Sequence, residues 1–331
     1  MPRSRASLGE HFDMTALLSL LLLGTLLATV APGRLARARW AEREPVLALW
    51  AWQCLVVAVL LCCVLGLLLA ASAALPELRA LLFTGAPREV EAAYGLSGSE
   101  GWGRLCAGLL ALGGVWTAVS FTREVRAARA LRDHRHAELR HRAPELPAEL
   151  TADRARSARE RLVVLENARP EAWSLPGPGA RLVVTTGALR QLSDHELAAV
   201  LSHERGHVRA RHHWLAQCAE ALATGFPGVG VFSAFRAQVG ELVELAADDR
   251  AARRHGRVTT ALALVELNSG RGLFGSCLPQ QLAQSPRRVD RLLAGEPRLP
   301  VHHRLRLTIT ALAAPAAVVL LAVAPGLATL F

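Results

Sequence analysis

The chain contains no lysine and few aromatic residues, so all 38 of its basic side chains are arginines and only 5% of its residues are Phe, Trp or Tyr. Proteins that bind nucleic acids usually combine a basic domain with aromatic side chains on which bases stack. Such aromatic residues are scarce here, and we therefore expect no direct binding of nucleic acid. Arginine is also typical of the cytoplasmic loops of membrane proteins, which fits this composition better.

Paired cysteines are absent as well. The six cysteines form no CxxC motif, and four of them lie in apolar runs. A disulfide framework or a zinc site built from cysteines would need a more regular spacing. We interpret these cysteines as small apolar side chains.

Apolar residues, in contrast, are abundant and must be concentrated in segments. They make up 52% of the 331 residues, and the mean hydropathy is +0.26 although 20% of the residues are charged. Each of four apolar runs is long enough to cross a bilayer, the shortest with help from its flanking residues. The sequence predicts a mainly α-helical, multi-pass membrane protein with four transmembrane helices, at residues 14–32, about 46–75, 105–121 and about 307–330.

The ends of the first two runs decide how they are interpreted. The first run is long, and no clear cleavage site precedes Arg34, so we expect a retained helix and not a cleaved signal peptide. Trp50 and Trp52 lie near one end of the second run. Indole side chains are common at the membrane interface, and we expect both tryptophans there.

The distribution of arginine predicts the orientation. The segment 33–46 contains four arginines, whereas 76–103 contains two. Because arginine-rich loops stay on the cytoplasmic side, we expect residues 33–46 and 122–306 to lie in the cytoplasm, most simply at a bacterial cell membrane.

The segment 123–142 is densely basic. We expect a helix with a solvated face there, and anchoring to anionic lipid is the alternative. Its histidines, at 134, 136 and 141, are expected on the surface. The chain is accordingly divided into a three-helix transmembrane region (1–122), a basic juxtamembrane linker (123–150), a mixed soluble domain (151–305) and a C-terminal transmembrane helix (306–331).

The soluble domain begins with strand signals. RLVVL (161–165) and RLVVTT (181–186) are short β-rich runs, which predict either an antiparallel pair or two strands of a small sheet. Ser193 and Glu196 then have the spacing of a capping box, which predicts the start of a helix.

Further helices are expected at about 236–254 and 257–268, where apolar residues recur at helical spacing. The apolar segment 223–235 lies between the helix that follows Ser193 and the helix at about 236–254. It is rich in glycine and too short to cross the bilayer and return. We expect it to be a turn docked on the membrane or on the core.

The helix that follows Ser193 contains LSHERGH (201–207), an HExxH motif. Residues four apart lie on one helix face, so the imidazoles of His203 and His207 can reach one zinc ion. Glu204 lies beside them and can take a proton from a water bound to that ion. A polar helix face with satisfied histidines is the alternative interpretation.

A catalytic zinc site needs a third protein ligand, and acidic residues of the helix at 236–254 are the candidates. Glu244 and Asp248 are four apart, and Glu241 shares their face. We expect Glu244 to bind the metal while Asp248 hydrogen-bonds a ligating histidine. Glu241 is the rival ligand, and a solvated acidic face is the alternative for the whole cluster.

The run VVTTGALRQLSDHELAAVLSHERGHVRARHH, followed by ELAADDRAA, resembles membrane-embedded zinc metallopeptidases of the HtpX-like and CAAX-prenyl-protease group. It is more similar still to their relatives, the antirepressor proteases of β-lactam sensors. The resemblance covers about 160–293, and its two motifs together are specific. It implies a cytoplasmic α+β zincin-like domain with a small sheet and the HExxH helix, and one Zn²⁺ per chain.

The resemblance also implies roles for individual residues. In that group the histidines of HExxH and the first glutamate of an ExxxD motif bind zinc, and the glutamate of HExxH is the acid–base. Carried over, the metal ligands are His203, His207 and Glu244, the catalytic residue is Glu204, and Asp248 supports the ligands.

Two departures from the group's pattern bear on this resemblance. Arg205 is charged where the heat-shock members usually have an apolar residue, which favours the antirepressor branch. The segment SPRRVDRLL (285–293) resembles the group's HPxxxxRI pattern, with Ser285 in place of the histidine and Arg291 in place of the arginine. For Arg291 we expect a structural ion pair.

The donor that would stabilise a developing oxyanion is left open by the sequence. The only tyrosine, Tyr94, lies in the predicted outer loop and is excluded. His302, His303, Asn268, an arginine or a backbone NH group remain candidates. His212 and His213 are expected on the surface.

The leading hypothesis is a membrane-anchored zinc metalloendopeptidase that hydrolyses cytoplasmic or membrane-associated polypeptides. A signalling protease with one dedicated transcriptional repressor as substrate is the second hypothesis, and a non-catalytic membrane scaffold with a structural zinc is the third. The third is disfavoured because structural zinc sites usually fill all four positions and often use cysteine.

Overall fold

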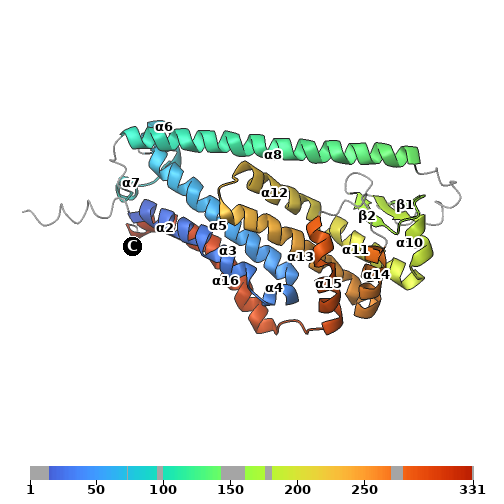
Figure 1. Ribbon diagram of the computed structural model, residues 1–331. Helices are drawn as coiled ribbons and strands as arrows, with labels where there is room; N and C mark the ends of the chain where they lie inside the picture. Colours follow the sequence, from blue (N-terminus) through green and yellow to red (C-terminus); the bar gives the residue numbers. More distant parts are fainter. Residues whose placement is uncertain are drawn as a thin grey trace, which may run out of the picture.

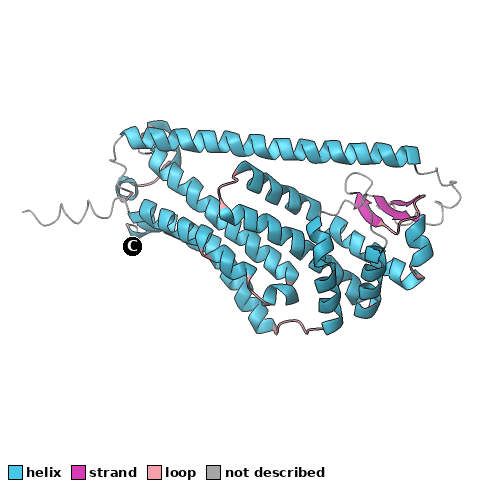
Figure 2. Ribbon diagram, viewed as in Figure 1, coloured by secondary structure: helices cyan, strands magenta, loops and turns pink. Residues whose placement is uncertain are grey.

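The computed structural model describes residues 15–72, 74–94, 100–142, 161–175, 181–269 and 279–329. Helices dominate the elongated molecule, and one small sheet lies at the end away from the chain's C-terminus (Figure 1, Figure 2). The expected fold class is confirmed: this is a mainly helical membrane protein with a small sheet beside the HExxH helix.

Within the described residues, four helices are long and apolar enough to cross a membrane, as the sequence predicts. Three of them pack together, because Leu20, Cys62 and Val318 belong to one buried cluster. The helices are α2 (Thr15–Thr29), α5 (Pro45–Ser72), α8 (Glu100–Arg142) and α16 (Val301–Ala328). The candidate spans are Ala16–Ala36, which runs from α2 through the short helix that follows it, and Pro45–Ser72, Gly101–Leu131 and Val301–Ala328.

Helix α8 continues without a break from the third apolar run into the basic segment, so the expected helix at 123–142 is confirmed. Residues 143–150 of the predicted linker lie outside the described residues. In Figure 1, α8 extends past the membrane helices and over α12 toward the sheet. The basic part of α8 is therefore part of the wall around the soluble domain.

Short helices connect the membrane helices. Tyr94 follows the last of them, and its hydroxyl donates a hydrogen bond to the carbonyl of Ala322 at 3.1 Å. This anchors the tyrosine at the end of the molecule opposite to the HExxH helix (Figure 1). The connecting helices are α3 (Ala31–Ala36), α4 (Trp40–Arg43), α6 (Pro76–Leu82) and α7 (Arg88–Ala92).

The sheet has three strands in the order β1-β3-β2. Strands β1 (Arg161–Leu165) and β3 (Arg181–Thr185) are the two predicted ones, but they pair in parallel, so the antiparallel alternative is wrong. The strand between them in sequence, β2 (Ala172–Leu175), was not predicted, and it pairs antiparallel to β3. Its four residues are too few to show an alternation, which explains why the sequence signal is missing.

The helices of the soluble domain follow the sheet. The capping box at Ser193 and Glu196 is present, so the predicted helix start is confirmed. The segment 223–235 differs from the expected turn, because only 226–229 lie between helices and the following helix begins at Gly230. The helices are α10 (Thr186–Gln191), α11 (Asp194–Arg209), α12 (His212–Gly225), α13 (Gly230–His255), α14 (Arg257–Ser269) and α15 (Pro279–Ala294).

A single hydrophobic cluster joins the membrane helix α5 to α12 and α13. Trp52 is fully buried in this cluster, with its ring 6.4 Å from that of Phe235. The expectation that Trp52 is an interfacial indole is therefore wrong, whereas the side chain of its neighbour Trp50 is exposed. The zinc motif of α11 packs on α13, so α13 connects the membrane region to the candidate site.

Candidate metal centre

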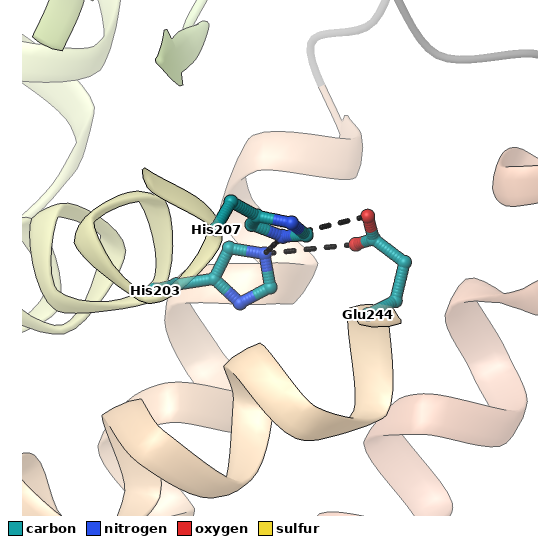
Figure 3. Close-up of side chains that lie close together, drawn as sticks. All are labelled: His203, His207 and Glu244. Carbon is teal, nitrogen blue, oxygen red and sulfur yellow. Dashed lines mark hydrogen bonds and ion pairs between the residues drawn. The ribbon is translucent and has the colours of Figure 1, made fainter. Parts of the chain in front are cut away.

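Helix α11 presents both histidines of the HExxH motif to α13 (Figure 3). The two helices approach closely because Gly206 lies between the histidines and has no side chain. A Cβ at this position would lie 3.2 Å from Cδ of Arg250 and 3.5 Å from Cα of Ala247. A larger residue would separate α11 from α13 and move the histidines away from the acidic residues opposite.

His203, His207 and Glu244 come together: helix spacing predicts this for the two histidines, and Glu244 is the expected third ligand on the other helix. The Nε2 atoms of the two histidines are 3.1 Å apart. The carboxylate of Glu244 lies 3.6 Å from Nε2 of His203 and 3.5 Å from Nε2 of His207 (Figure 3). Within the described part of the chain, these three residues form the group of His, Cys, Asp and Glu side chains that could hold a metal ion.

The geometry of this group fits a tetrahedral zinc ion. Ligand atoms about 2.0–2.1 Å from the metal are roughly 3.3 Å from each other in a tetrahedron. The separation of the two Nε2 atoms lies close to that value, and so does the distance from each of them to its nearer Glu244 oxygen, Oε2 for His203 and Oε1 for His207. The side chains of His203 and Glu244 are 15% exposed and that of His207 is 19% exposed. Solvent or a substrate can therefore reach the position that the protein leaves open.

Asp248 lies behind the histidines and is buried. Its carboxylate is 3.0 Å from Nδ1 of His203, on the side of the ring that points away from His207 and Glu244. A carboxylate there fixes the ring orientation and leaves Nε2 free to bind a metal. This is the geometry expected for Asp248 from the sequence. The rival ligand Glu241 lies outside the cluster and pairs with Arg287 at 3.3 Å.

Arg288, on α15, was not anticipated by the sequence analysis. It is buried, and its guanidinium donates two hydrogen bonds to Asp248, at 2.8 and 2.7 Å. A third nitrogen of the same group lies 2.9 Å from Glu244. The arginine therefore joins the two acidic residues of α13. In the same segment, the sequence predicts a structural ion pair for Arg291. Arg291 lies about one helical turn after Arg288 and pairs with Asp249 at 2.7 Å.

His212 is buried, so its expected surface position is wrong. Its Nδ1 is 3.1 Å from Nδ1 of His207. The cause is a sharp turn after α11. Arg211 adopts a left-handed conformation with φ of 53°, and α12 begins at the next residue, so His212 lies next to His207. If His207 binds a metal through Nε2, it carries its proton on Nδ1 and donates it to His212.

Glu204 contacts the edge of the sheet. Burial raises the pKa of its carboxyl group, while hydrogen bonds from the side chain and backbone of Ser174 oppose that change. Ser174 belongs to β2, the strand that sequence analysis missed. The predicted acid–base residue thus lies between the histidines and an edge strand.

Neighbouring charges and burial give the two histidines very different pKa values. Burial alone would lower the pKa of His203, but Asp248 and Glu244 accept its hydrogen bonds and raise the pKa to about 10. For His207, burial dominates and lowers the pKa to about 4. Burial and the neighbouring His207 lower the pKa of His212 to about 3. Glu244 resists the effect of burial, and its pKa is lowered by His203 and Arg288.

A cleft of about 520 Å³ opens at this cluster. Helix α8 contributes Leu131 to its wall, and β2 contributes Ala172, Trp173 and Ser174. His302 and His303 are exposed at the start of α16 and are not among the residues that line the cleft. The side chain of Asn268 lies outside the described residues. Of the basic candidates for an oxyanion donor, Arg288 does line the cleft.

Comparison with known proteins gives one match. Residues 134–265 match the sequence profile of Peptidase family M48. The matched segment runs from the end of α8 to α14 and contains the HExxH helix, Glu244 and Asp248, but not Arg288. Searches of curated proteins and of solved structures found no significant match.

This match confirms the resemblance to zincin-type metallopeptidases, the family that includes HtpX and the CAAX protease, and it supports a metallopeptidase function. It does not single out the antirepressor branch. The family is zinc-dependent in general, in agreement with the His–His–Glu group. Residues 134–265 of this chain are therefore similar to Peptidase family M48.

Proposed function

We propose that this protein is a membrane-anchored zinc metalloendopeptidase in which His203, His207 and Glu244 bind one Zn²⁺ and Glu204 is the acid–base. The convergence of these ligand atoms at tetrahedral separations is the observation that supports it most. When bound, zinc would act as a Lewis acid on a water molecule and on the scissile carbonyl.

The residues of the chain then have distinct tasks. Glu204 accepts the proton of the attacking water as the new C–O bond forms, and it returns that proton to the leaving amine as the C–N bond breaks. Its raised pKa favours the first step, because a more basic carboxylate takes the proton of the water more readily. Ser174 holds the carboxylate in place.

Strand β2 offers a binding site for the backbone of a polypeptide. It is hydrogen-bonded to β3 on one side and is at the edge of the sheet, and three of its four residues line the cleft. An extended chain can pair with such an edge strand through its backbone, which gives affinity with little dependence on side chains. A polypeptide is thus a better fit to this cleft than a small molecule.

The test is hydrolysis by the purified full-length protein. With zinc it should cleave a casein-like substrate, and a chelator should abolish the activity. Glu204→Gln should lower the rate of hydrolysis by at least about 10²-fold while the protein keeps its bound zinc. Glu244→Gln should lose the metal, whereas the matched variant Glu241→Gln should keep it. Persistent hydrolysis by Glu204→Gln would refute the proposed mechanism.

The domain is proposed to face the cytoplasm of a bacterial cell, on the strength of the arginine distribution. A reporter fused after residue 150 tests this orientation. A reporter that is active only on the outer side would contradict it. Comparing the proteomes of cells that contain the wild type or Glu204→Gln would then show whether the substrate is one repressor or a broad set of proteins.

A further inference from the structure

The tip of the α12–α13 hairpin, residues 221–235, contains no charged residue. Charged side chains begin on both sides directly after it, at Glu220 and Arg236. These two residues pair across the hairpin at 3.1 Å. The pair closes the base of an apolar tip that has neither a catalytic nor a metal-binding role in the proposed function.

The tip lies against the apolar part of the membrane helix α8. The indole of Trp116 donates a hydrogen bond to the carbonyl of Gly225 at 2.6 Å. Ser120 is so near that a Cβ at Gly225 would lie 3.1 Å from its side chain. Both α8 residues precede Arg123, where the charged part of that helix begins. Gly225 therefore lies at a depth where α8 is still apolar.

The tip also lies along the membrane helix α5. Val231 and Phe232 are buried in the same cluster as Val56 and Val59, which lie in the interior of α5. Helix α5 has 28 residues, so it is about 42 Å long, against a hydrocarbon layer of about 30 Å. Its first two turns can lie outside the bilayer, but Val56 and Val59 follow them.

The charged residues nearest the tip lie close together and mark one depth in the molecule, here called the polar level. Glu124 of α8 is 3.4 Å from the hydroxyl of Thr224, close to the pair formed by Glu220 and Arg236. Helix α13 begins at Gly230, six residues before Arg236, which corresponds to about 9 Å along the axis. If the polar level marks the membrane surface, the tip reaches about 9 Å into the apolar layer.

Part of the backbone of the tip is hydrogen-bonded within the hairpin, although the start of α13 has no side-chain cap. A turn in hydrocarbon must satisfy its own amide groups. The amides of Phe226, Val229 and Phe232 each donate to a carbonyl three or four residues earlier. The exposed positions at the turn, Pro227 and Gly228, are uncharged.

From these observations we propose that the α12–α13 tip is inserted into the hydrocarbon layer of the bilayer beside α5 and α8, with lipid acyl chains covering its exposed side. Figure 1 shows the hairpin turn pointing from the soluble domain toward the membrane helices and running under α8. The soluble domain is thereby held against the membrane by a second, non-spanning anchor.

The insertion places the cleft close to the bilayer. His212 lines the cleft and lies eight residues before Glu220 on α12, a distance of about 12 Å. An extended chain covers that distance in about four residues. Resting on the proposed function, this predicts that membrane-anchored polypeptides are cut within about ten residues of their membrane segment.

Spin labels test the insertion independently of activity. In a full-length chain whose six cysteines are replaced by alanine, Gly228→Cys, Gly230→Cys and Gly240→Cys are labelled in nanodiscs. A Cβ at each of these glycines meets no atom within 4 Å, so the labels should not disturb the fold. Gly240 is the matched control, because it lies on the same helix beyond Arg236.

The insertion predicts that labels at 228 and 230 collide with oxygen severalfold more than with a water-soluble nickel complex, and that the label at 240 shows the reverse. Equal access of the nickel complex to all three positions would overturn the proposal. Labels at 228 and 230 that are immobilised and reached by neither reagent would also overturn it, since a protein would then cover the tip.

A substrate with one membrane segment and a long cleavable tail tests the consequence. Mass spectrometry should find cuts near the membrane segment, and cuts spread evenly along the tail would contradict the predicted position of the cleft. If the wild type cleaves no substrate at all, the proposed function fails, while the spin labels still decide whether the tip is inserted.

Discussion

Asp248 supports the candidate zinc site through its hydrogen bond to Nδ1 of His203. Replacement of such a carboxylate commonly weakens zinc binding about 10–100-fold, because the ring loses its fixed orientation. We expect Asp248→Asn to show a loss in that range when zinc is titrated against a chelator. Asp249→Asn is the matched control, since Asp249 pairs with Arg291 and does not contact the histidines. Equal losses in both variants would argue against a specific role.

Arg288 neutralises two acidic residues, the buried Asp248 and the partly buried Glu244, so its removal should matter most when no metal is bound. Breaking a buried ion pair by removing one partner costs about 3–5 kcal/mol. We expect Arg288→Met to lower the unfolding free energy of the zinc-free protein by an amount in this range, and to lower it less when zinc shares the charge of Glu244. The neighbouring Arg287→Met is the control, because its side chain is 65% exposed and exposed pairs contribute about 0–1 kcal/mol. Similar losses in the two variants would contradict this account.

At the scale of elements, the turn between α11 and α12 brings His212 back to His207. Arg211 has a φ of 53°, a conformation that costs an ordinary residue about 1–2 kcal/mol and a β-branched residue more. Arg211→Gly should therefore keep or raise the stability, and Arg211→Val should lower both stability and zinc affinity. Thermal unfolding and chelator titration would check this. A valine that leaves both unchanged would show that the turn does not position His212.

Local signals predicted the elements well where the physics is local. The capping box, the HExxH spacing and the shared face of Glu244 and Asp248 depend on neighbours in one helix, and the structure has this arrangement. The parallel pairing of β1 with β3 depends on contacts far apart in sequence, and it was missed together with β2. His212 and Arg288 were missed for the same reason, because one needs the left-handed turn and the other needs the packing of α15 on α13.

At the scale of the whole molecule, Trp52 joins the membrane region to the soluble domain. It is fully buried between α5 and α13. Replacing a buried tryptophan by alanine costs about 3–5 kcal/mol, so Trp52→Ala should destabilise both parts together in detergent. The control Trp50→Ala, two residues away and 59% exposed, should change the stability by about 0.5 kcal/mol or less. Separate unfolding of the two parts in the wild type would contradict a shared core.

The membrane spans could be predicted from hydropathy, but their junction with the soluble domain could not. Apolar length alone identified four spans. The sequence did not show that residues 230–235 form the first turns of α13 and pack along α5. A buried helix start and an apolar turn have the same composition, so composition could not distinguish them. The division of the chain into a transmembrane region, a linker, a soluble domain and a C-terminal transmembrane helix stays a prediction.

The central claim is that one zinc ion lies between α11 and α13, and anomalous X-ray diffraction at the zinc edge tests it most directly. The account predicts one peak per chain, about 2.0–2.2 Å from Nε2 of His203, Nε2 of His207 and a carboxylate oxygen of Glu244. A peak elsewhere in the chain, a different set of ligands, or no peak in zinc-saturated protein would contradict it.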